Sequence, residues 1–239
     1  MGTKQTHNHI PLARLPASRT LRPFSLVALG IAMLAWADGE KADFLPNEHT
    51  LELVHQHYNL LAVERVKHWR RFVDEGLPGI QDEAKLARVN HFFNRVPGVL
   101  DQTNWKQPDY WATPVELLAS NGGDCEDYAL AKYFTLTAIG IPAERLRITY
   151  VLVWIAREQR MESHMVLAYY PSPDADPLIL DNLIPDIKPA SARTDIKPIL
   201  SFNADGLWSA KQRAQNGRIG DASKIKHWNG LLARMRQEH

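Results

Sequence analysis

The sequence predicts an α+β fold in which helices from the first half of the chain pack on an antiparallel sheet from the second half. Two observations support this prediction. From residue 49 to Gly140 the apolar residues recur mostly at helical spacing, whereas beyond Pro142 the apolar runs are rich in β-branched and aromatic residues. The turns between these later runs are short, which favours antiparallel pairing of successive strands.

Residues 1–37 form a predicted signal peptide. A basic stretch without any acidic residue precedes an apolar run over 24–36, which ends in the A-x-A pattern closing at Ala37. This order is typical of a secretory signal that is cleaved after Ala37. The run is shorter than the ~20 apolar residues of a comfortable membrane span, although the long basic stretch leaves an uncleaved anchor as the alternative. Residues 38–239 are enough for one domain with a substantial core.

Four helices are predicted in the first half, each followed by glycine or proline. Asp82 is expected to cap the second helix, and Thr113 the short third helix, which has Pro114 at its first position. The expected helices are 49–75, Asp82 to the residue before Pro97, Val115–Ala119, and Cys125 to about Ile139.

Three strands and one candidate strand are predicted in the second half. Polar residues 157–163 and the proline–aspartate segment 171–177 are expected to form the turns between the first three. Beyond Ile187 the chain is less regular and ends in a basic tail. The expected strands are Leu146–Ile155, His164–Tyr170, Leu178–Asp181 and, as the candidate, Ile199–Asn203.

Cys125 is the single cysteine of the chain and a candidate nucleophile. It follows Gly122-Gly123-Asp124 and precedes an apolar run, which places it on the first turn of a helix. Unpaired backbone N–H groups and the helix dipole favour a thiolate there. An exported chain with one cysteine cannot form an internal disulfide, so this thiol is either free and reactive or pairs between chains. A buried, inert cysteine is the structural alternative.

His164 and Asp181 are the candidates for a base and for the group that orients it. His164 is expected to start a strand whose residues Val166, Ala168 and Tyr170 share its face. Asp181 closes an apolar strand, where a half-buried acid needs a partner. Asn182 is the alternative orienting group. The alternative without a catalytic role is that His164 is an incidental strand residue and that Asp181 initiates a turn.

Carboxylates surround the candidate nucleophile. Asp124, Glu126 and Asp127 lie within three residues of Cys125, and their negative charge should raise the pKa of the thiol. Two interpretations stay open. The acids either cap the helix and favour its positive end, or bind a hard divalent cation such as Ca²⁺ that offsets their charge.

The segments around these residues are similar to a known family. The match lies in YWATPVE at 110–116, GGDCEDYA at 122–129, SHMV at 163–166 and LDN at 180–182. These motifs resemble the bacterial transglutaminase-like cysteine proteinases and, among them, the LapG group of periplasmic proteases. The resemblance covers most of residues 45–205. It implies a papain-like, transglutaminase-like fold, a Cys125–His164–Asp181 triad, and Ca²⁺ dependence through Asp124 and Glu126 and, less directly, Asp127.

The resemblance also implies a location and partners. The family's proteases act in the periplasm on a large surface adhesin that holds biofilms together, which they cut in its N-terminal region at a di-alanine site. An inner-membrane receptor that senses cyclic di-GMP sequesters the protease until the level of cyclic di-GMP falls. A transglutaminase or an amidase would use the same triad and is the alternative function. A binding module without chemistry is disfavoured because all three triad residues are present.

The charge of the chain excludes one class of partner. The full sequence has 28 basic and 27 acidic residues, and removal of the basic signal region leaves the remainder mildly acidic. Binding of nucleic acid through phosphate neutralisation is therefore not expected.

Overall fold

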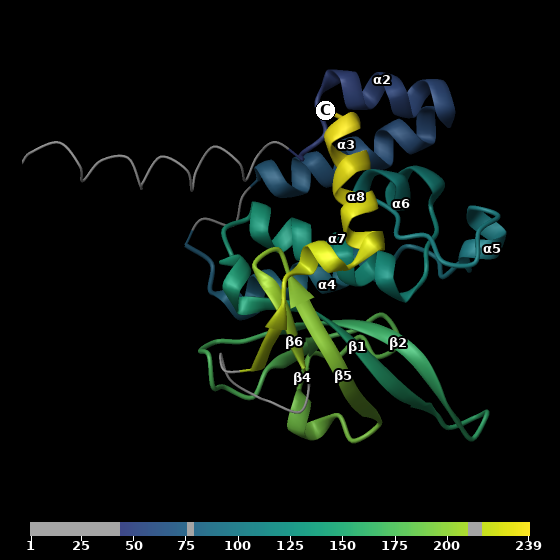
Figure 1. The fold of residues 1–239 in the computed structure, drawn as a ribbon. Helices are drawn as coiled ribbons and strands as arrows, with labels where there is room; N and C mark the ends of the chain where they lie inside the picture. The colour runs from purple at the N-terminus through teal and green to yellow at the C-terminus, as the bar shows by residue number, and fades with distance from the viewer. Residues whose placement is uncertain (1–43, 76–78, 210–216) are drawn as a thin grey trace, which may run out of the picture. The chain divides into compact units, whose positions relative to one another are not determined.

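Apart from the C-terminal helix α8, helices occupy the first half of the described chain and strands the second, as the sequence predicts (Figure 1). A computed structural model describes residues 44–75, 79–209 and 217–239, so the predicted signal peptide and its cleavage site lie outside the described residues. The helices are α2 Glu48–His57, α3 Leu60–Asp74, α4 Asp82–Phe93, α5 Asp101–Asn104, α6 Pro114–Ser120, α7 Cys125–Ala138 and α8 Lys226–Gln237. The strands are β1 Leu146–Ile155, β2 Arg160–Tyr169, β3 Leu178–Leu180, β4 Lys188–Pro189, β5 Ile196–Asn203, β6 Gly206–Ser209 and β7 Arg218–Gly220.

The described strands form one antiparallel sheet with β1 near its centre. The strand order is β4-β3-β2-β1-β5-β6-β7, and the pairing of neighbouring strands is antiparallel throughout. The prediction for β1 is confirmed, but β2 begins at Arg160 rather than at His164. The polar residues of the expected turn take strand positions because the pairing with β1 continues to Ile155, opposite Arg160. Arg160 and Glu162 form an ion pair at this exposed end of the hairpin. His164 therefore lies within β2, opposite Val151 of β1.

Three predictions about helices were wrong. Asp82 is the first residue of α4 and not its cap, because Gln81 takes the N-cap position, without a side-chain hydrogen bond. The single helix expected over 49–75 is two helices, because Asn59 starts a new one: its side chain accepts the N–H of Ala62 at 3.0 Å. The expected basic tail is helix α8, which buries Trp228, Leu231 and Met235. Their spacing of three and four residues was present in the sequence, but the basic residues between them gave the segment the composition of a tail.

The core is organised around α7. Nearly every residue from Asp127 to Thr137 is buried, because the helix packs against β1 and β2 on one side and against α4 and α6 on the other. Trp69 of α3 is fully buried and donates its indole N–H to Thr135 Oγ1 at 2.9 Å. The start of α7, and with it Cys125, is thus held by packing on several sides.

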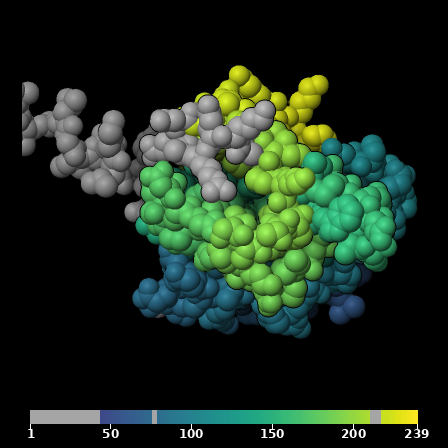
Figure 2. Space-filling model, turned by 90° about the horizontal axis from the view of Figure 1, so that it is seen from below, coloured from purple at the N-terminus to yellow at the C-terminus, as the bar shows by residue number. Residues whose placement is uncertain are grey.

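The sheet has a second face on which none of the described α-helices packs; of the described helical segments, only the short 3-10 helix Ala190–Ala192 contacts it. In Figure 1 the helices lie on one side of the sheet, and Figure 2 views the molecule from the opposite side. Val151, Val166, Ala168 and Ile179 form a small buried cluster on this face. Val166 and Ala168 share the face of Tyr170, as predicted from the alternation along β2. Among the described helices, none combines the length and the hydropathy that a bilayer-spanning segment requires.

Candidate active site

A tight turn connects α6 to α7. Asn121 ends α6 with a left-handed φ of 56°, and Gly122-Gly123 follow. A Cβ atom on Gly123 would lie 2.5 Å from Asp127 Oδ2 and 2.6 Å from Leu117 Cδ1, so only glycine fits there. Thr113 caps α6 as predicted, and it forms a capping box with Glu116. These local features place Cys125 at the first position of α7, as predicted.

His164 and Asp181 are in contact. His164 Nε2 lies 2.8 Å from Asp181 Oδ1, and both side chains are almost fully buried. Burial opposes ionisation of Asp181, but hydrogen bonds from His164, Leu183 N–H and Arg193 prevail and lower the pKa of its carboxyl to about 2. Asn182, the alternative orienting group, has its Oδ1 buried without a partner. The structure thus supports Asp181 rather than Asn182 as the group that orients His164.

Two groups that sequence reasoning missed hold Asp181 in place. Arg193 Nη2 lies 2.8 Å from Asp181 Oδ2, and the same guanidinium makes two hydrogen bonds to Asp195. Asn94, the residue that caps the C-terminus of α4, donates to the backbone oxygen of Asp181 at 2.8 Å. Arg193 is buried, and arginine is rarely buried unless its charge is paired, as it is here. No local sequence signal marks Arg193 or Asn94, since both reach Asp181 only through tertiary packing.

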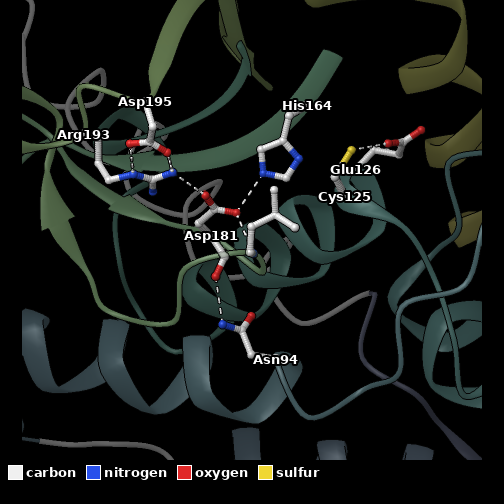
Figure 3. Close-up of polar contacts among 8 residues, drawn as sticks. Asn94, Cys125, Glu126, His164, Asp181, Arg193 and Asp195 are labelled. Atoms are coloured by element: carbon white, nitrogen blue, oxygen red, sulfur yellow. Dashed lines mark hydrogen bonds and ion pairs between the residues drawn. The ribbon is translucent and has the colours of Figure 1, made fainter. Parts of the chain in front are cut away.

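Cys125, at the start of α7, belongs to the helix that packs on β2, the strand that carries His164. The backbone N–H of Met165, the residue after His164, lies near the sulfur and favours the thiolate, which lowers the pKa of the thiol slightly against the other influences. Figure 3 shows the His164 ring between Asp181 and Cys125, with one ring nitrogen bonded to Asp181 and the other facing the side of the sulfur. Within the described residues the thiol donates to Glu126 Oε2 at 3.0 Å, and no hydrogen bond joins it to His164. Burial and the charge of Glu126 raise the pKa of the thiol far above its usual value.

The acids around Cys125 gather with two further aspartates, Asp101 and Asp109. The oxygen atoms of Asp101, Asp124 and Asp127 approach within 4.8 Å of one another, as do those of Asp101, Asp109 and Glu126. Burial, followed by neighbouring negative charge, raises the pKa of Asp124 to about 9. The sequence placed three acids here, and tertiary folding adds two from the segment between α4 and α6.

This cluster fits a hard divalent cation. Oδ1 of Asp101 and Oδ1 of Asp124 are buried without any hydrogen-bond partner, and carboxylate oxygens are the ligands that Ca²⁺ prefers. In contrast, both carboxylate oxygens of Asp127 accept hydrogen bonds. Its Oδ1 accepts the N–H of Ala112 at 2.7 Å, and its Oδ2 accepts the N–H of Asp124 at 3.2 Å. It thereby also serves the capping role considered above. Asp101, Asp124 and Glu126 are the side chains that would hold the ion, with Asp109 and Asp127 beside them.

The fold and the arrangement of these side chains define a class of enzyme. A cysteine at the start of a central helix, with a His–Asp couple on the adjoining antiparallel sheet, is the layout of a thiol hydrolase. The family comparison agrees: the model described as "Bacterial transglutaminase-like cysteine proteinase BTLCP" matches residues 78–199. No curated protein sequence matched the chain.

Solved structures of Legionella pneumophila LapG are similar to this chain. One is 41% identical, covers 79% of this chain and 96% of its own, and superposes with a TM-score of 0.66. An EGTA-treated form has the same identity and coverage with a TM-score of 0.67. A calcium-bound form is 40% identical over 77% of this chain and 98% of its own, with a TM-score of 0.65.

The chain belongs to the bacterial transglutaminase-like cysteine proteinases. It is a LapG-like cysteine protease with the α+β, transglutaminase-like fold that the sequence predicts. The triad assignment and the metal ligands stay predictions for this chain, supported by the geometry described above.

Proposed function

We propose that this protein is a calcium-dependent periplasmic endopeptidase that cuts the N-terminal region of a large biofilm adhesin. Membership of the family and the likeness to LapG support this proposal. The observation that carries the chemistry is the position of Cys125 at the start of α7, on the side of the His164 ring that faces away from its buried partner Asp181 (Figure 3).

The proposed reaction follows from these positions. His164 takes the proton of Cys125, and the thiolate attacks the carbonyl carbon of the scissile peptide. Asp181, held by Arg193, fixes the tautomer and orientation of the imidazole. The backbone N–H of Cys125 stabilises the oxyanion, a contribution of about 3 kcal/mol for one such donor. His164 then protonates the leaving amine, and water hydrolyses the thioester.

The sequence offers the indole of Trp111, ahead of that of Trp105, as a second oxyanion donor, although core packing is the favoured role of both residues. Trp111 is buried and stacks on Phe202 with ring centroids 5.6 Å apart, which fits the core-packing role. The indole N–H of Trp105 is buried without a partner.

Calcium dependence has a physical reason in the structure. The thiol is hydrogen-bonded to Glu126, whose charge opposes thiolate formation. A bound Ca²⁺ would supply positive charge that offsets the carboxylates of Asp124 and Glu126. Glu126 would then no longer be the acceptor of the thiol proton, which leaves His164 as the base.

The decisive experiment mixes the purified protein with the N-terminal region of a co-encoded giant adhesin. Cleavage is expected with Ca²⁺, near a di-alanine, and not with EGTA or with Cys125→Ala. Incorporation of a labelled primary amine or release of peptidoglycan fragments, without adhesin cleavage, would instead indicate a transglutaminase or an amidase.

We also propose that an inner-membrane receptor for cyclic di-GMP controls the enzyme by sequestration. The likeness to LapG supports this part. The receptor's periplasmic domain should suppress cleavage of the adhesin when the receptor is loaded with cyclic di-GMP. Equal cleavage with the loaded and the empty receptor would contradict this regulation.

A further inference from the structure

A second site of different chemistry lies on the face of the sheet that none of the described α-helices covers. A cavity of about 350 Å³ opens there, in the size range of small-molecule pockets. Its apolar part is formed by Val151, Val166, Ala168 and Ile179, each at most 3% exposed. Figure 2 shows the molecule from this side.

Arg147 gives the cavity a buried positive charge. This residue of β1 lines the cavity and is only 8% exposed. Its Nε is buried without a hydrogen-bond acceptor, and no carboxylate among the described residues forms an ion pair with it. A buried guanidinium is costly unless its N–H groups are paired. Arg193, the other buried arginine among the described residues, has two carboxylate partners.

Two aromatic rings lie against the Arg147 guanidinium. Its Cζ lies 4.7 Å from the ring centre of Tyr170 and 4.3 Å from that of Trp208. The two rings approach from opposite sides of β1, since Tyr170 follows β2 and Trp208 belongs to β6. Such cation–π contacts stabilise the positive charge but supply no acceptor for the N–H donors, which point outward in the plane of the guanidinium.

We infer that this cavity binds a small organic acid, with the carboxylate on the N–H edge of Arg147 and an apolar body against the valine and isoleucine side chains. A carboxylate matches the planar, two-donor edge of arginine. Ser201 also lines the cavity beside Arg147 and can add a hydroxyl donor. The acids at the rim do not occupy Arg147: Asp176 accepts the N–H of Ser191, and Asp174 is exposed.

The test uses 3-phenylpropanoate and its neutral amide, which have the same shape, with binding to the purified protein measured by calorimetry. The acid is expected to bind at least tenfold more tightly than the amide. Arg147→Met should remove this preference, and Arg147→Lys should retain part of it. Arg157→Met, at an exposed arginine of the β1–β2 turn, is the matched control and should bind as the wild type does.

A second variant guards against misfolding of the Arg147 substitutions. Ala168→Leu keeps Arg147 but fills the cavity floor, and it should weaken binding of the acid at least tenfold. Equal affinity for the acid and the amide, unchanged binding by Arg147→Met, or no binding of the acid at 5 mM would each overturn the inference. None of these results depends on proteolysis, so the proposed function is tested separately.

Discussion

Glu126→Gln tests the electrostatic control of the nucleophile. Glu126 Oε2 lies 3.0 Å from Cys125 Sγ and opposes thiolate formation. Two unit charges about 4 Å apart interact by about 4 kcal/mol near a protein surface, which is about a thousandfold in the thiolate fraction. Because a less basic thiolate is also less nucleophilic, about half of the logarithmic gain remains. Without calcium, Glu126→Gln should therefore be alkylated by iodoacetamide about 30-fold faster than the wild type.

Calcium should narrow the difference in alkylation rate between the two proteins. In the wild type, added Ca²⁺ should accelerate alkylation of Cys125, because a cation at the acid cluster offsets the charge of Glu126. Glu126→Gln lacks this ligand and should respond little. The assay is mass-spectrometric alkylation at pH 7.5 in EGTA and in Ca²⁺, with Glu64→Gln on the exposed surface of α3 as the control. Equal rates for Glu126→Gln and the wild type in EGTA would refute the reasoning.

Three further predictions concern the triad, its support and the acid cluster. Cys125→Ala should keep the melting temperature but lower adhesin cleavage at least a thousandfold; an active variant would remove the nucleophile assignment. Arg193→Met should lower the free energy of unfolding in urea by about 3 kcal/mol, because it leaves the buried Asp181 uncompensated; unchanged stability would show that the ion pair adds nothing. Burial raises the pKa of Asp124 to about 9 in the folded state, so the folded protein holds a proton that the unfolded chain has lost. Stability in EGTA should therefore fall as pH rises from 5 to 8, and Asp124→Asn should flatten this fall; equal slopes would contradict the raised pKa.

Local patterns in the sequence predicted most of the elements near the site. The capping box at Thr113 and the glycines before Cys125 are signals contained within a few residues, so the start of α7 was predicted correctly. The β-branched run of β1 was likewise sufficient for its bounds. The break between α2 and α3 at Asn59 was missed, because the apolar periodicity continues across it.

The sequence by itself determined the class of the protein: an apolar helix headed by Cys125, followed by strands that carry His164 and Asp181. Only the tertiary structure decided what surrounds these groups. It showed that Arg193 forms a hydrogen-bonded ion pair with Asp181, that Asp101 joins the acid cluster, and that the thiol of Cys125 is hydrogen-bonded to Glu126. The physical reason is that burial and charge pairing depend on segments far apart in the chain, which no local pattern records.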